Sequence, residues 1–101
     1  MAKLIVISWR DIPAQVIVKQ GRETAKAPLS QRFQEAVDRA AMRAGRGSSD
    51  AYLADWKRST PRACGIDLAA EATAEAARLE ASYSDADLEQ LIRAHGVAKE
   101  R

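Results

Sequence analysis

The chain opens with two apolar segments whose patterns favour β-strands. Residues 3–9 hold a nearly unbroken run of aliphatic and aromatic side chains at both odd and even positions, which is typical of a strand in a sheet interior. Residues 14–20 alternate more cleanly, with Val16 and Val18 on one face and mainly polar residues on the other. The link between the segments is too short for a parallel crossover. The pattern therefore predicts an antiparallel hairpin, with Pro13 at its turn or at a sheet edge.

The strongest helical pattern lies between residues 30 and 44. Apolar residues recur there at the three- and four-residue spacing of a single helix face. Ser30 stands in the N-cap position, and Gly45 is the kind of residue expected just beyond a helix end. The preceding residues 21–28 are mostly polar and end in proline, so we expect a loop there.

Two further helices are predicted near the C-terminus. The alanine-rich segment 68–83 follows Asp67, a good N-cap residue, and its composition favours helix. Ser84 and Asp87 have the spacing of a capping box for a last helix, which Gly96 would end.

The middle of the chain fits more than one structure. Residues 51–58 carry two aromatic residues on one helical face but could equally open a strand, and we expect a strand between Trp56 and Ala63. The order of elements predicts an α+β domain: a small antiparallel sheet that starts with an N-terminal β-hairpin and carries about three helices on one face. A length of 101 residues fits a single domain over residues 1–96. Residues 97–101 are expected to fray.

Composition narrows the class of protein. Apolar residues make up 47% of the chain and charged residues 30%, close to globular averages, so a disordered or fibrous chain is excluded. A single cysteine excludes an intramolecular disulfide. The longest apolar run, residues 4–7, is far too short for a membrane span or a secretory signal. We therefore expect a cytoplasmic protein that makes no membrane contact and carries no cofactor.

Charge is unevenly distributed along the chain. Residues 1–62 carry 12 Lys/Arg and 6 Asp/Glu, a net charge of +6, whereas residues 63–101 carry 4 and 8, a net charge of −4. One interpretation is a nucleic-acid face on the basic helix 30–44, with Arg39 and Arg43 as contact residues. The other is a solvated helix face and pairing between the two halves, which the absence of an RNA-binding motif favours.

No residue spacing in the chain specifies a reaction. Cys64 follows Arg62 closely, a neighbour that would favour the thiolate, but a nucleophile also needs a base, and the only histidine, His95, lies in the C-terminal segment. One histidine and one cysteine do not complete a structural zinc site. We predict no catalytic residue and no metal ligand, and a thiol-dependent enzyme using Cys64 stays as an alternative.

The predicted hairpin turn, residues 9–13, has the least ordinary composition, because an aromatic residue, a cation, an acid and a rigid proline come together there. An exposed tryptophan and arginine are typical interface anchors. Alternatively, Arg10 stacks on an aromatic ring and Asp11 bonds to turn amides, a purely structural role. The candidate interaction residues are Trp9, Arg10, Asp11, Arg39, Arg43 and Trp56.

Three stretches resemble the small bacterial "virulence factor" domain family. They are Ile7-Ser8-Trp9-Arg10-Asp11-Ile12-Pro13-Ala14-Gln15-Val16, then Leu29-Ser30-Gln31-Arg32-Phe33 with Ala36-Val37-Asp38, and Tyr52-Leu53 followed by Trp56. The resemblance covers roughly residues 3–83. Related domains occur in the larger conserved virulence factor C proteins of Gram-positive bacteria, beside scaffold-like and helical-repeat segments, whereas stand-alone versions in proteobacteria tend to be encoded near folate-linked one-carbon enzymes and corrinoid methyltransferases.

Both contexts imply a non-enzymatic accessory or adaptor protein with a protein partner, such as a small subunit in folate-linked one-carbon or corrinoid methyl-transfer metabolism. No catalytic residues are established for the family, so the resemblance carries none to this chain. The alternative from the residues themselves is a nucleic-acid-binding regulator using the basic helix 30–44.

Overall fold

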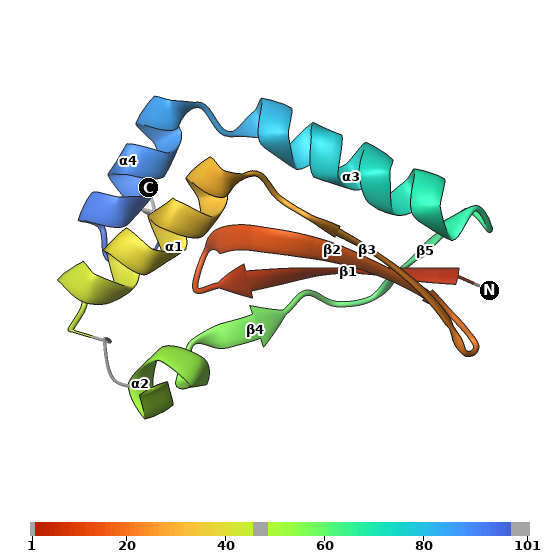
Figure 1. Cartoon of the computed structure of the whole chain (residues 1–101), viewed down its shortest axis with the longest axis horizontal. Coiled ribbons are helices and arrows are strands. Elements are labelled where there is room, and N and C mark those ends of the chain that lie inside the picture. Colours follow the sequence, from red (N-terminus) through yellow and green to blue (C-terminus); the bar gives the residue numbers. More distant parts are fainter. Residues whose placement is uncertain (1, 46–48, 98–101) are drawn as a thin grey trace.

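The computed structural model describes residues 2–45 and 49–97, which form an antiparallel sheet with helices packed against it (Figure 1). The strands are β1 (Ala2–Trp9), β2 (Ile12–Gln20), β3 (Glu23–Pro28), β4 (Trp56–Arg58) and β5 (Arg62–Cys64), and the helices are α1 (Gln31–Arg43), α2 (Ser49–Ala54), α3 (Leu68–Ser82) and α4 (Asp85–Arg93). The predicted α+β class is confirmed, with α1, α3 and α4 as its three longer helices.

Strand β1 is the centre of the sheet. Its partner on one side is β2, in the predicted antiparallel hairpin, and β3 continues the sheet beyond β2. The short strands β4 and β5 share the other side, β4 opposite residues 7–9 and β5 opposite residues 2–4. The strand expected between Trp56 and Ala63 is thus present as two short pieces along β1.

Residues 23–28 form strand β3, so the loop predicted there is wrong. Ala25 and Ala27 are partly buried against the core, while Lys26 between them is exposed. This is the alternation of a strand. Alanine is small and has a low strand propensity, so the alternation is difficult to recognise from the sequence. The strand forms because Gly21, at φ +60°, allows a tight turn that lays it against β2.

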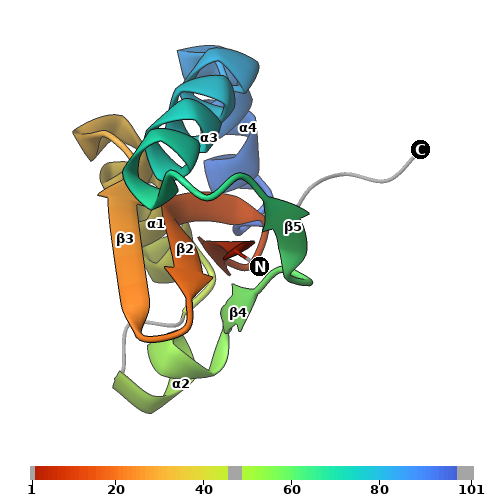
Figure 2. The same cartoon turned by 90° about the vertical axis from the view of Figure 1, so that its right-hand side faces the viewer.

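Helices α1, α3 and α4 cover one face of the sheet, whereas α2 lies beside β4. Helix α3 runs along the strands, while α1 and α4 pack together at the end where β1 turns into β2 (Figures 1 and 2). The predicted apolar stripe of α1 is its buried face, including Phe33, which is fully buried. Burying a side chain of that size stabilises the fold by about 2–3 kcal/mol. The largest fully buried side chains are Trp9, Phe33, Ile12, Val16, Val18 and Val37.

Helix ends follow the sequence signals with one exception. Asp67 caps α3 with its side chain, and Ser84 and Asp87 form the predicted capping box of α4. In contrast, the Ser30 side chain does not cap α1. The Ser30 N–H and hydroxyl instead donate to the two carboxylate oxygens of Glu80, at 2.6 and 2.9 Å. The start of α1 is therefore held by a residue of α3.

None of the described helices is long and apolar enough to cross a membrane. Of the segment 97–101 that was expected to fray, only Val97 is described, and the rest lies outside the described residues.

Candidate interaction site

Trp9 lies in the interior, so the expectation of an exposed tryptophan at the hairpin turn is wrong. Its side chain is 0% exposed. The indole N–H donates to the Tyr52 carbonyl at 2.9 Å, and the two rings stack with centroids 6.1 Å apart. Gly96 packs so closely that a Cβ there would lie 2.8 Å from the indole Cζ3. Trp9 therefore ties β1 to α2 and to the C-terminal segment.

Arg10 joins three segments at the same corner. Its Nη1 donates to the His95 carbonyl at 2.8 Å, and its Nη2 lies 3.3 Å from the Asp55 carboxylate. The guanidinium carbon sits 5.0 Å from the centre of the Trp9 ring. The predicted stacking of Arg10 on an aromatic ring is thus present. The joint connects the β1–β2 turn to the residues before β4 and after α4.

Asp11 and Trp56 complete this corner. The Asp11 carboxylate pairs with the Lys57 ammonium at 3.0 Å, and the Asp11 N–H donates to the Gly96 carbonyl at 2.8 Å. Trp56 lies directly opposite Trp9 in the sheet and meets the Tyr52 ring edge-on. Four of the six candidate residues, Trp9, Arg10, Asp11 and Trp56, are therefore brought together by the fold.

A surface depression of about 320 Å³ opens beside these residues. Three segments distant in the sequence line it, and we call the depression with its lining the hairpin corner: Arg10, Asp11, Ala54, Asp55, Trp56, Lys57 and Val97. Val97 is 48% exposed and Ala54 is also exposed. Of the residue types in this lining, tryptophan and arginine are the ones enriched at protein interfaces, and Trp56 and Arg10 supply them here.

The sequence reasoning missed Ala54, Asp55, Lys57 and Val97. Nothing in the local pattern marks them, because they meet Arg10 and Asp11 only through the β1–β4 pairing and the return of the chain after α4. The β-strand expected after Trp56 was the one available signal, since a strand there would pair with the first hairpin.

Arg39 and Arg43 do not line the hairpin corner. Both lie on α1, where Arg39 pairs with Glu89 of α4 at 3.4 Å and Arg43 is exposed in the last turn. The six candidates are therefore divided between two places on the molecule.

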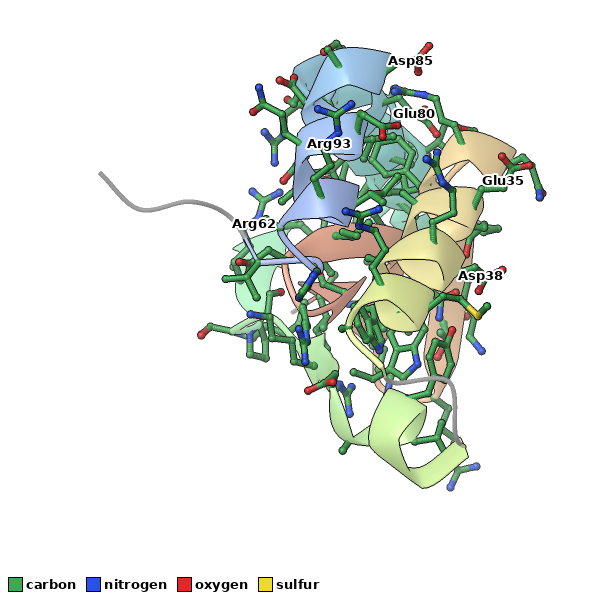
Figure 3. All side chains as sticks on the ribbon, turned by 90° about the vertical axis from the view of Figure 1, so that its left-hand side faces the viewer. Glu35, Asp38, Arg62, Glu80, Asp85 and Arg93 are labelled. Atoms are coloured by element: carbon green, nitrogen blue, oxygen red, sulfur yellow. The ribbon has the colours of Figure 1, made fainter. Side chains whose placement is uncertain are left out.

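Ion pairs join the basic first half of the chain to the acidic second half, which confirms the predicted pairing. Figure 3 labels Arg62, Glu80 and Asp85 among these groups. The pairs are Arg32 with Glu80 and Asp85, Arg39 with Glu89, and Arg62 with Glu75. Much of the positive charge on α1 is thereby neutralised within the molecule.

Glu75 is a buried acid on α3, only 6% exposed. Hydrogen bonds from Arg78 lower its pKa; burial opposes the shift, and the charges of Arg78 and Arg62 reinforce it. Because Arg62 belongs to β5, the carboxylate of Glu75 holds that strand to the helix layer. The geometry gives Glu75 a structural role.

Cys64 and His95 are far apart. Cys64 is half-buried on β5 opposite Ala2, at the start of β1, whereas the His95 carbonyl meets Arg10 just past the other end of that strand. An eight-residue strand is about 25 Å long. Across residues 2–45 and 49–97, no three His, Cys, Asp or Glu side chains are grouped to hold a metal ion. The thiol-enzyme alternative thus gains no base from this histidine.

Comparison with protein families gives a match. The sequence model of a family described as "Virulence factor" matches residues 7–92. This range includes the end of β1, all of β2 and α1, and almost all of α4. No curated protein and no solved structure matches the chain.

Proposed function

This chain belongs to the virulence factor family, and we propose that it is a non-enzymatic accessory or adaptor protein that binds a protein partner at the hairpin corner. The observation that carries the proposal is the hairpin corner itself, a depression built from three distant segments around the most unusual motif of the sequence.

The construction of the corner suits binding. Arg10 and Asp11 are held by ion pairs to Asp55 and Lys57 and by backbone hydrogen bonds, so little conformational freedom remains to be lost when a partner docks. The exposed part of Val97 supplies apolar area, and the partly exposed Lys57–Asp11 pair supplies a polar rim. Such a surface offers shape and contact groups to a partner.

We propose as partner an enzyme of folate-linked one-carbon or corrinoid methyl-transfer metabolism, in the cytoplasm. Support for this class comes from the resemblance to stand-alone proteins encoded near such enzymes. The chain would then act as a small subunit or helper that leaves the chemistry to the enzyme.

The proposal is tested by affinity purification of the tagged chain from the cells that make it. Ala54→Arg places a bulky cation in the hairpin corner, and Ala77→Arg makes the same change on the exposed side of α3, away from the corner. We expect a one-carbon or methyl-transfer enzyme to copurify with the wild type and Ala77→Arg, and its yield to fall at least tenfold with Ala54→Arg. Equal yields from both variants would remove the hairpin corner as the binding surface, and a partner of another class would refute the metabolic assignment.

The nucleic-acid alternative receives less support. Arg32 and Arg39 on α1 are engaged by acids of α3 and α4, which reduces the positive potential the helix can offer to phosphates. Only phosphate contacts would remain, and binding through them should vanish as salt rises toward roughly 200 mM.

A further inference from the structure

The sheet has a second face, opposite the one that carries α1, α3 and α4. Leu4, Val16 and Val18 point into the core beneath the helices, and successive strand residues point to alternate faces. Ile5 and Ile17, which face each other across β1 and β2, therefore lie on this second face.

Strand pairing arranges the side chains of this face in three rows. One row runs Arg58, Ile7, Gln15; the next runs Ile5, Ile17, Lys26; and the third runs Lys3, Lys19, Thr24. The three isoleucines form an apolar centre, in which Ile5 is buried and Ile7 and Ile17 are half-buried. Cations stand at the corners and along the margin of this centre. A shallow depression of about 520 Å³ lies over most of these rows; its lining consists of strand residues and leaves out Lys3 and Ile5. We call this arrangement the basic sheet face.

The charge on the basic sheet face is of one sign. Lys3, Lys19, Lys26 and Arg58 are exposed, and none of them forms an ion pair with another described residue. None of the residues in the three rows is acidic. Lys3 and Lys19 stand directly opposite each other, an arrangement of like charges that destabilises a sheet when nothing neutralises it.

This charge pattern contrasts with most of the other cations. Arg10, Arg32, Arg39, Lys57 and Arg62 meet carboxylates of the same chain, whereas Arg22 and Arg43 are exposed single cations outside the three rows. The basic sheet face therefore groups four cations that no carboxylate of the described residues pairs with, and an acidic partner would complement them.

We infer that the basic sheet face docks an acidic, amphipathic helix of a protein partner. With strands about 4.8 Å apart and rows about 7 Å apart, the patch measures roughly 14 Å each way, which matches two to three turns of a helix. Leucine-like side chains at three- and four-residue spacing would cover the exposed parts of Ile7 and Ile17. Glutamates or aspartates beside them would reach the surrounding lysines and arginine.

The composition of the face favours a protein segment over single-stranded nucleic acid. Both ligands are acidic, but bases bind by stacking on aromatic rings, and none of the residues in the three rows is aromatic. Aliphatic isoleucines instead match apolar side chains. The inference goes beyond the proposed function, because it concerns a different surface from the hairpin corner and specifies the chemistry of the docked segment.

The test uses fluorescence anisotropy with the full chain and a labelled peptide of about 14 residues, in which leucines stand at helical spacing and glutamates fill most other positions. Two control peptides replace either the leucines or the glutamates with glutamine. At about 150 mM salt, we expect the acidic amphipathic peptide to bind with Kd below roughly 100 µM and both controls to bind at least tenfold more weakly.

The protein variants are Lys19→Glu, on the basic sheet face, and Arg43→Glu, which makes the same charge change at the end of α1. Lys19→Glu should weaken peptide binding at least tenfold, while Arg43→Glu should change it less than twofold. Lys3→Glu, at the position directly opposite in the sheet, serves as a second variant if Lys19→Glu lowers the melting temperature of the fold. Ala54→Arg should leave peptide binding unchanged, so this inference and the proposed function can fail independently.

Three results would overturn the inference. The first is absence of peptide binding, or equal loss with Lys19→Glu and Arg43→Glu. The second is tighter binding of an oligo-dT strand than of the peptide, lost in Lys19→Glu, which would make this a nucleic-acid surface. The third is a dimer in sedimentation that Lys19→Glu dissociates, which would make a second copy of the chain the occupant.

Discussion

Arg10 and Asp55 are joined twice, once through their side chains at 3.3 Å and once through the Arg10 N–H, which donates to the Asp55 carbonyl at 3.0 Å. Arg10 also adopts φ +52°, a left-handed backbone conformation that is unfavourable for residues other than glycine. The contacts of its guanidinium group offset that strain. Arg10 therefore holds the hairpin corner together, and its guanidinium group is engaged in contacts within the molecule.

Replacing Arg10 by alanine should destabilise the fold. The change removes the ion pair with Asp55, the hydrogen bond to the His95 carbonyl and the stacking on Trp9, while the positive φ remains. We expect the free energy of unfolding to fall by about 2 kcal/mol, measured by urea denaturation. Lys57→Ala, at a more exposed pair, is the comparison and should cost about 0.5 kcal/mol. An Arg10→Ala protein that unfolds like the wild type would show that these contacts contribute nothing net.

Gly96→Ala should be more costly than Gly21→Ala. Both glycines have positive φ, +88° and +60°, so both substitutions carry backbone strain of about 1 kcal/mol. A Cβ at Gly21 meets nothing within 4 Å, whereas one at Gly96 would lie 2.8 Å from the Trp9 ring. Because of this added clash, Gly96→Ala should lower the free energy of unfolding by about 3 kcal/mol. Equal melting temperatures of the two variants would mean that the C-terminal segment moves away from Trp9 at little cost.

Glu75 should make stability depend on pH in the acid range. Because the Arg78 hydrogen bonds hold its pKa below the ordinary value of 4.5 in the folded state, its contribution is complete above that value and is lost as pH falls through the lower, folded pKa. Urea denaturation at a series of pH values below 5 should therefore show a smaller decline for Glu75→Gln than for the wild type, with a lower stability at pH 7. An unchanged decline would assign the acid sensitivity to other carboxylates.

Glu80 should stabilise α1 more than the residue in the N-cap position does. Its carboxylate accepts both the N–H and the hydroxyl of Ser30 and also pairs with Arg32. Glu80→Ala should lower the free energy of unfolding by about 2 kcal/mol, whereas Ser30→Ala keeps the backbone hydrogen bond and should cost about 1 kcal/mol. Thermal denaturation of the two variants and of the double mutant measures their coupling. Strictly additive effects would contradict a shared contact.

Features that depend on nearby residues were predictable. The apolar stripe of α1, the Asp67 cap of α3 and the capping box of Ser84 and Asp87 all lie within a few residues of each other in the chain, so the spacing of residue types is enough to place them. The first hairpin was predictable for the same reason, because four linking residues permit only an antiparallel return. The family resemblance rests on the hairpin turn, the start of α1 and the stretch from Tyr52 to Trp56, and the family model matches residues 7–92.

The candidate site could be predicted only in part. The motif around Arg10 and Asp11 stood out in the sequence. However, the neighbours of a tryptophan in the sequence do not show whether its ring is exposed or buried. Its burial depends on Tyr52 and Gly96, which approach from positions 43 and 87 residues further along the chain. Sequence alone could not show that the fold covers this ring.

The sequence by itself determined the amphipathic helices, the hairpin and the uneven charge of the two halves, because each is a property of neighbouring residues or of composition. Only the tertiary structure decided that β3 pairs with β2, that Glu80 holds the start of α1, and that Arg10 reaches Asp55. It also decided which cations are paired inside the molecule and which, on the basic sheet face, are directed outward. These outcomes depend on distances between segments, and such distances follow from how the whole core packs rather than from any local pattern.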